Sequence, residues 1–290
     1  MTNPLTVGVD GSDPSLRAID WAVSEAALHH VPLRLLHASL WEHYDRVRPQ
    51  IRSVRAAGDV MAEHIAASAA ERAAKQDPTV AVSTEISPRE GVAALLQAAD
   101  DSFALVLGNR GRGELAGMVL GSTSLDVAAR ATCPVVVVRD GSPDGHGAFG
   151  RVTVGVGPEG ESSAAVAFAF REAQVRGAEL RAVHTWRAPL HGLPGTGLRG
   201  DASVPQVHEA GAVLDEALRA AEQQYPDVAV RHDVVEDRAR TALLDAATTS
   251  DLLVVGARRR RGSVGMQLGQ VNHAVLHHAD CAVAVVPQEN

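Results

Sequence analysis

The chain repeats itself along nearly its whole length, and this duplication constrains the fold more than any other feature. The segment "TVGVDGS" at Thr6 returns as "TVGVGPEG" at Thr153. The segment "LVLGNRGRG", which contains Gly108, returns as "LVVGARRRRG", which contains Gly256. Paired segments lie 147 or 148 residues apart throughout. A nearly constant offset of this size indicates a duplicated domain.

A segment rich in glycine and proline separates the two copies. It reads "DGSPDGHGAFG" and spans residues 140–150, and such a composition is typical of a linker. We therefore predict an N-terminal domain at 1–140 and a C-terminal domain at 151–290. A chain of 290 residues is also long enough for two domains of ordinary size.

Within the first copy, short apolar runs alternate with longer segments of helical periodicity. The predicted strands are Leu5–Val9, Leu33–His37, Thr79–Ile86, Ala104–Gly108 and Val135–Val138. Predicted helices start at Ser12 or Asp13 and lie within Ala56–Gln76, Pro88–Ala99 and Ser122–Ala131. The second copy follows the same order from Val152 to Val286, with one helix at Val207–Ala221. Five strands alternating with four helices predict an α/β fold, a parallel sheet with helices on both faces.

Composition excludes several classes of protein. The formal net charge is −8 and the isoelectric point is near 5.9, which argues against a nucleic-acid-binding protein held by bulk positive charge. No apolar run approaches the roughly 20 residues of a membrane span, and the N-terminus does not resemble a signal peptide. The two cysteines, Cys133 and Cys281, do not make a disulfide framework. We therefore expect a cytoplasmic protein.

Glycines follow the fourth predicted strand at a fixed spacing. Gly108 and Gly111 are separated by two residues, and nine more precede Gly121 and Ser122. Glycine allows positive φ and close approach of a ligand to the backbone. Gly121 and Ser122 open a helix, whose first N–H groups and dipole attract phosphate. The stretch predicts a phosphate-binding loop at the carboxyl edge of the sheet.

Charged residues beside this loop fit the same interpretation. Arg110 and Arg112 supply positive charge for a phosphate. Asp10 ends the first strand, where a carboxylate can accept hydrogen bonds from ribose hydroxyls or from an adenine amino group. The sequence Asp-Gly-Ser is equally typical of a turn, so both roles for Asp10 stay open.

These motifs together resemble the universal stress protein family in its tandem two-domain form. The resemblance rests on "VDGS" after the first strand, the Gly108–Ser122 glycine spacing and "CPVVVV" at Cys133, and it covers the chain twice. It implies two Rossmann-like domains of the HUP type with strand order 3-2-1-4-5. It also implies association through the last strands, either in a homodimer or between the two halves of one chain.

The resemblance further implies ATP as the ligand, with Mg²⁺ as an optional companion. ATP would lie between the first and fourth strands, with Asp10 contacting adenosine and backbone near Ala38 lining the adenine pocket. Ribose and phosphates would be held by Gly108, Gly111, Gly121 and Ser122. The second copy departs from this pattern, because Arg259 replaces the middle glycine, Gln270 the serine and Gly157 the aspartate. We expect it to be intact as a fold and degenerate as a site.

Other motifs are weaker. "GVGPEG" at Gly155 has dinucleotide-type spacing, but the next strand does not end in an acidic residue. A P-loop is excluded because Lys75 is the only lysine. His273 and His277 have zinc-type spacing without a third ligand nearby. We expect His37 and His184 to be structural, and Cys133 and Cys281 to be small core residues.

The sequence favours an ATP-binding protein with a regulatory role and without strong catalysis. Phosphate would order the loop Asn109–Leu120 and so change which partner is bound. A slow ATPase or phosphotransferase in the same pocket is one alternative, but no general base or metal carboxylate is evident beside the phosphates. A scaffold that binds no nucleotide is another.

Overall fold

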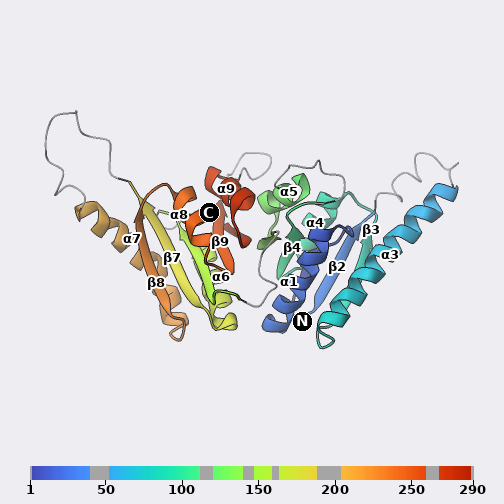
Figure 1. Cartoon of the computed structure of the whole chain (residues 1–290), viewed down its shortest axis with the longest axis horizontal. Helices are drawn as coiled ribbons and strands as arrows, with labels where there is room; N and C mark the ends of the chain where they lie inside the picture. The colour runs from blue at the N-terminus through green and yellow to red at the C-terminus, as the bar shows by residue number, and fades with distance from the viewer. Residues whose placement is uncertain are drawn as a thin grey trace.

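One ten-stranded sheet runs through both halves of the computed structural model (Figure 1). The structure describes residues 2–39, 52–111, 120–139, 147–158, 163–187, 204–258 and 268–288. In the first half the elements are β1 (Leu5–Gly8), α1 (Asp13–His29), β2 (Leu33–Ala38), α3 (Arg52–Gln76), β3 (Val82–Ser87), α4 (Gly91–Ala99), β4 (Ala104–Gly108), α5 (Ser122–Arg130) and β5 (Val135–Val138). In the second half they are β6 (Arg151–Val156), α6 (Ser163–Arg176), β7 (Glu179–Trp186), α7 (Val204–Gln224), β8 (Val230–Glu236), α8 (Ala239–Ala247), β9 (Leu252–Arg258), α9 (Gln270–His278) and β10 (Ala282–Gln288).

The strand order is the same in both halves. It runs β3-β2-β1-β4-β5 in the first half and continues as β10-β9-β6-β7-β8 in the second. All pairs within a half are parallel, for example Leu5 opposite both Leu33 and Ala104. The predicted fold, with order 3-2-1-4-5 in each half, is therefore confirmed.

The two halves join through their last strands. β5 and β10 pair in antiparallel fashion, with Val137 opposite Val283 and Val135 opposite Val285. The other edge of β5 is occupied by β4, and the other edge of β10 by β9. Of the two associations that the resemblance implied, pairing within one chain is the one present. Neither last strand has an edge left for a homodimer of that kind.

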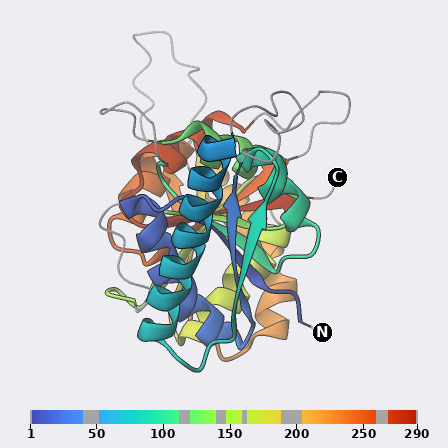
Figure 2. The same ribbon diagram turned by 90° about the vertical axis from the view of Figure 1, so that its right-hand side faces the viewer.

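Helices cover both faces of the sheet. One core packs under α1, α3, α6 and α7, and a second packs under α4, α5, α8 and α9. Side chains alternate between the two cores along each strand, so that Val106 belongs to the first core and Leu105 and Leu107 to the second. Figure 2 shows this from the β3 end, with α3 lying over one face. No helix in the described part of the chain is long and apolar enough to cross a membrane.

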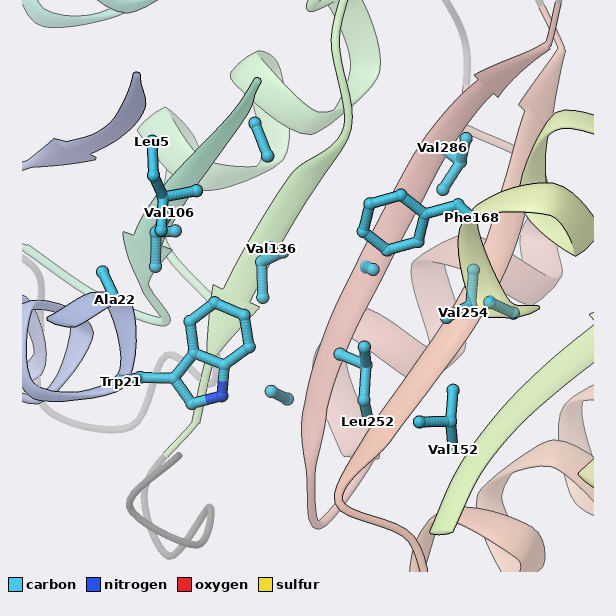
Figure 3. Close-up of a cluster of buried hydrophobic side chains, with 14 of the residues drawn as sticks. Leu5, Trp21, Ala22, Val106, Val136, Val152, Phe168, Leu252, Val254 and Val286 are labelled. Carbon is cyan, nitrogen blue, oxygen red and sulfur yellow. The ribbon is translucent and has the colours of Figure 1, made fainter. Parts of the chain in front are cut away.

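At the junction between the two halves, equivalent positions of the two repeats lie on opposite sides. Trp21 on α1 and Phe168 on α6 lie 147 residues apart in the sequence, and both are buried. Figure 3 shows them on either side of the β5–β10 seam, near Val136 and Val286. The contact is therefore pseudo-symmetric. It resembles the interface of a symmetric homodimer, although both halves belong to one chain.

Local sequence explains where the elements begin and end. Ser12 caps α1, as predicted, since its side chain accepts a hydrogen bond from the N–H of Ser15. The third strand starts later than predicted, at Val82 rather than Thr79. The reason is a turn in which the N–H and hydroxyl of Thr79 both donate to Asp77 Oδ1, at 2.8 and 2.7 Å.

Both cysteines lie in the core, as expected. Cys133 is 8% exposed and Cys281 is 1% exposed. Burial raises the pKa of each thiol to about 12. Since the thiolate is the reactive form, these residues are packing groups rather than nucleophiles.

Candidate functional site

A cavity of about 250 Å³ lies at the carboxyl ends of β1, β2 and β4 in the first half. This is the edge at which parallel α/β sheets bind ligands. Five of the seven predicted site residues line it, namely Asp10, Ala38, Gly108, Arg110 and Gly111. The structure thus brings together residues from three strands that are up to about 100 positions apart in the sequence.

Asp10 performs the turn role that the sequence left open, and it also faces the cavity. Its Oδ1 accepts hydrogen bonds from the N–H of Ser12 at 2.9 Å and from the Ser12 hydroxyl at 2.6 Å. Ser12 in turn accepts from the N–H of Ser15 at 3.4 Å. This chain of contacts fixes the carboxylate beside the start of α1.

Gly111 lies against the other carboxylate oxygen of Asp10. A β-carbon added at Gly111 would lie 2.9 Å from Asp10 Oδ2, closer than real side chains approach. Neither Gly111 nor Gly108 has positive φ, so the conformational reason expected for these glycines is wrong. At Gly111 the reason for glycine is space beside a carboxylate.

Chain packing requires glycine at position 108. A β-carbon there would lie 2.7 Å from the backbone of Pro14, at the start of α1. The carbonyl of Gly108 also accepts a hydrogen bond from the Ser124 hydroxyl at 2.8 Å, which ties α5 to β4. Glycine at this position lets the start of α1 approach the end of β4 closely. Gly108 also lines the cavity.

Gly121 and Ser122 are not among the residues that line the cavity. The N–H of Gly121 already donates to the carbonyl of Asn109 at 2.7 Å, and the Ser122 side chain is exposed. The next two residues, Thr123 and Ser124, reach the cavity instead. Gly121 is the N-cap of α5 and provides no side-chain cap. The helix thus begins at Ser122 as predicted, but the residues that reach the cavity are the second and third of the helix.

His37 also lines the cavity, although its sequence context indicated only a structural role. Its Nδ1 lies 2.7 Å from the carbonyl oxygen of Val9. The repeat copy, His184, makes the same contact with Val156 at 2.9 Å, so the structural role is confirmed in both halves. With Nδ1 donating to the carbonyl, neutral His37 presents Nε2 as an acceptor. The signal in the sequence for this structural role was that a histidine occurs at the same position in both repeats, as His37 and His184.

Apolar residues that sequence reasoning missed form the remaining wall. They are Gly8, Val9, Leu36, Gly91, Leu95 and Leu107. A β-carbon on Gly8 would meet Leu107 at 2.6 Å and Leu95 at 3.2 Å. These residues match an ordinary core pattern, and only the fold reveals that they end beside an opening.

The second half differs at the matching place. A β-carbon on Gly256 would lie 2.8 Å from Gln288 Nε2, at the end of β10. Gln288 is 5% exposed, and its Oε1 accepts a hydrogen bond from the N–H of Ala164 at 3.2 Å. Beside Gly256 a side chain thus takes the place that the Pro14 backbone takes beside Gly108. Arg259 lies outside the described residues.

The other motifs also have structural explanations. Gly155 lies within β6, as its alignment with the first half predicted, and packs against Leu243. The rings of His273 and His277 stack with centroids 4.6 Å apart, and the described residues bring no third ligand to this pair. Residues 112–119, most of the loop that we expect phosphate to order, lie outside the described part, as does Arg112.

Comparisons with known proteins agree with the repeat. The model of the "Universal stress protein family" matches residues 1–139 and again 148–287. A universal stress protein of Mycobacterium tuberculosis (strain ATCC 25618 / H37Rv) is 36% identical over 98% of this chain and 97% of its own. The crystal structure of a universal stress protein from Archaeoglobus fulgidus DSM 4304 superposes with a TM-score of 0.70 at 15% identity, over 100% of both chains.

One further structure carries a nucleotide. It is a universal stress protein in complex with cAMP, 29% identical, which covers 48% of this chain and 98% of its own with a TM-score of 0.35. At that level of likeness it says nothing about the ligand of this chain. The two family matches and the relative aligned over nearly the full length decide the identity: this chain belongs to the universal stress protein family and carries two of its domains in tandem.

Proposed function

We propose that the first domain binds ATP in the cavity between β1, β2 and β4, and that occupancy regulates which partner the protein binds. The observation that carries this proposal is the convergence of Asp10, Gly111 and the first turn of α5 on one opening. A carboxylate next to a glycine suits a ribose, and an uncapped helix end suits a phosphate. The protein would act in the cytoplasm, where ATP is available.

Different residues of the cavity lining suit the adenine, the ribose and the phosphates of ATP. The apolar side of the cavity, with Leu36, Ala38 and Leu95, suits the adenine ring. Asp10 would accept hydrogen bonds from the ribose hydroxyls. Arg110 and the N–H groups of Thr123 and Ser124 would face the phosphates, with Gly121 and Ser122 holding the helix start in place.

The size of the cavity is consistent with part of a nucleotide. Its volume of about 250 Å³ lies just below the roughly 300–1,000 Å³ of small-molecule sites. Among the described residues that line the cavity, Asp10 is the one carboxylate.

The residues that line the cavity support a role in binding ATP rather than in catalysis. Fast phosphoryl transfer needs a group that orients the nucleophile and positive charge held on the transferred phosphate. Asp126, the nearest carboxylate on α5, is exposed and does not line the cavity. We propose one ATP per chain, because Arg259, Gln270 and Gly157 replace the middle glycine, the serine and the aspartate in the second domain.

The test uses a pair of matched substitutions at the two helix starts. Gly121 and Gly269 are the N-caps of α5 and α9, and both have extended backbone that aspartate adopts easily. Gly121→Asp adds negative charge where the phosphates would lie, while aspartate is a favourable N-cap that preserves the helix. Gly269→Asp makes the same change in the second half and is the control.

We expect ATP to raise the Tm of the parent and of Gly269→Asp by similar amounts, measured by differential scanning fluorimetry. Gly121→Asp should still fold, as circular dichroism would show, and should lose at least tenfold in affinity. No ATP-dependent shift in the parent would contradict the proposal and favour a scaffold. ATP hydrolysis by the parent well above background, absent in Gly121→Asp, would favour the enzyme alternative.

A further inference from the structure

A buried cluster of charged side chains lies where the two domains meet. Glu25 and His29 are one turn apart on α1, and Glu172 and Arg176 are one turn apart on α6. All four side chains are 7% exposed or less. Glu25 and Glu172 are the same position in the two repeats, as are His29 and Arg176. The cluster therefore lies at the pseudo-symmetry axis, far from the cavity.

Two carboxylates direct one oxygen each toward the same nitrogen. His29 Nε2 lies 3.3 Å from Glu25 Oε1 and 3.1 Å from Glu172 Oε1. One ligand atom from each of the three residues lies within 4.8 Å of the others. Ligand atoms around a tetrahedral zinc ion, at zinc distances of about 2.0–2.2 Å, are separated by about 3.3 Å. The first two separations match that value.

Neither short distance is a well-aligned hydrogen bond. His29 Nε2 and Glu172 Oε1 are buried and have no hydrogen-bond partner in the described structure. Both carboxylate oxygens therefore lie to the side of the direction in which a proton on Nε2 would point. A metal ion about 2 Å from Nε2 would lie between the oxygens and contact both.

Arg176 contacts the other oxygen, Oε2, of each of the two carboxylates. Arg176 contacts Oε2 of Glu25 through Nη2 and lies 3.4 Å from Oε2 of Glu172 through Nε. The guanidinium thus occupies the Oε2 atoms and leaves the Oε1 atoms turned toward His29. Fixing a ligand through its other atom is the usual role of the groups around a metal site. The ring of His29 is also packed against Phe103, with centroids 4.8 Å apart.

We propose that Glu25, His29 and Glu172 form a metal site that clamps the two domains together through one divalent transition-metal ion. A His and two carboxylates are the donor set that zinc accepts, with water or a second carboxylate oxygen as the fourth ligand. Since α1 also begins at the cavity, next to Asp10, the ion would set the position of the helix that the two sites share.

A charge cluster without metal is the alternative that the experiment must separate. His29 occupies the repeat position of Arg176, so a protonated His29 would act there as a second cation. The substitution His29→Arg copies the residue of the second repeat and keeps a cation, but it removes the nitrogen ligand. It is therefore expected to fold. The pair His273→Gln/His277→Gln removes the stacked histidines of α9 that could bind zinc adventitiously, and it is the matched control.

Chelator-treated protein is titrated with ZnCl2 by calorimetry, and separately with CoCl2 while the visible spectrum is recorded. We expect one zinc per chain, a zinc-dependent rise in Tm of several degrees and cobalt absorption bands typical of a low-coordinate site. All three should persist in His273→Gln/His277→Gln and vanish in His29→Arg. The proposal is overturned if the parent binds no zinc, or if His29→Arg binds it with unchanged stoichiometry and Tm shift. ATP titrations need not change, so failure here leaves the nucleotide proposal standing.

Discussion

Gly111 leaves room for the carboxylate of Asp10: a β-carbon at Gly111 would lie 2.9 Å from Asp10 Oδ2. The other oxygen, Oδ1, is tied to Ser12 by two hydrogen bonds. The carboxylate therefore cannot turn away without breaking contacts that fix the start of α1. The position of Gly111 in the glycine pattern therefore provides space for the Asp10 carboxylate, in addition to its proposed role beside the phosphates.

Gly111→Ala should weaken ATP binding by roughly five- to tenfold. The new methyl group displaces the Asp10 carboxylate, and the loss of a hydrogen bond costs about 1 kcal/mol. Isothermal titration calorimetry measures the change. Gly91→Ala is the control, because Gly91 lines the same cavity and a β-carbon there meets nothing within 4 Å. Equal affinities for the two variants would show that the Asp10–Gly111 contact is irrelevant to the ligand.

Asp10→Asn should fold normally and bind ATP about tenfold or more weakly. Asparagine still accepts the turn hydrogen bonds from Ser12, but it loses the charged acceptor proposed for the ribose, an interaction of about 1.5–3 kcal/mol. Asp13→Asn makes the same charge change at an exposed position outside the cavity. A matching loss of affinity in Asp13→Asn would attribute the effect to net charge instead.

The two thiols should be unreactive in the folded protein at pH 8. Burial raises the pKa of Cys133 and Cys281 to about 12, so about one thiol in ten thousand is ionised at that pH. A colorimetric disulfide reagent should modify neither thiol in the native protein and both in denaturant. Because deprotonation is favoured only above the raised pKa, reactivity should increase steadily with pH. Rapid modification of the native protein at pH 8 is the contrary result.

Trp21→Ala should lower the free energy of unfolding by about 3–5 kcal/mol, as expected for removing a large core side chain. Trp21 is 3% exposed at the seam between the halves, and the guanidinium carbon of Arg176 lies 5.6 Å from the centroid of its ring. Urea unfolding followed by circular dichroism provides the value. Met61→Ala, at a 51% exposed position on α3, should change it by about 0.5 kcal/mol or less. Similar values for both would mean that the seam contributes little.

The repeat made the fold predictable from the sequence. Two copies of one strand and helix pattern gave the parallel sheet and its helices, and the resemblance to the family supplied the strand order. Boundaries shifted where side chains decide them, as at Asp77 and Thr79, whose hydrogen bonds delay β3. The domain limits of 1–140 and 151–290 stay predictions.

The site was predictable in part. Asp10 and Gly111 stood out by residue type and spacing, and the fold brings them together. Gly121 does not line the cavity, and its N–H donates to the carbonyl of Asn109, a contact that spacing does not reveal. The cluster of Glu25, His29 and Glu172 was invisible in the sequence, since it forms only when α1 and α6 meet across the seam.

The number of nucleotides bound per chain tests the central claim most directly. Native mass spectrometry of the full-length protein with added ATP counts them, and Gly121→Asp identifies the domain. The account predicts one ATP per chain in the parent and none in Gly121→Asp at the same concentration. Two ATP molecules per chain, or one that persists in Gly121→Asp, would contradict a single site in the first domain.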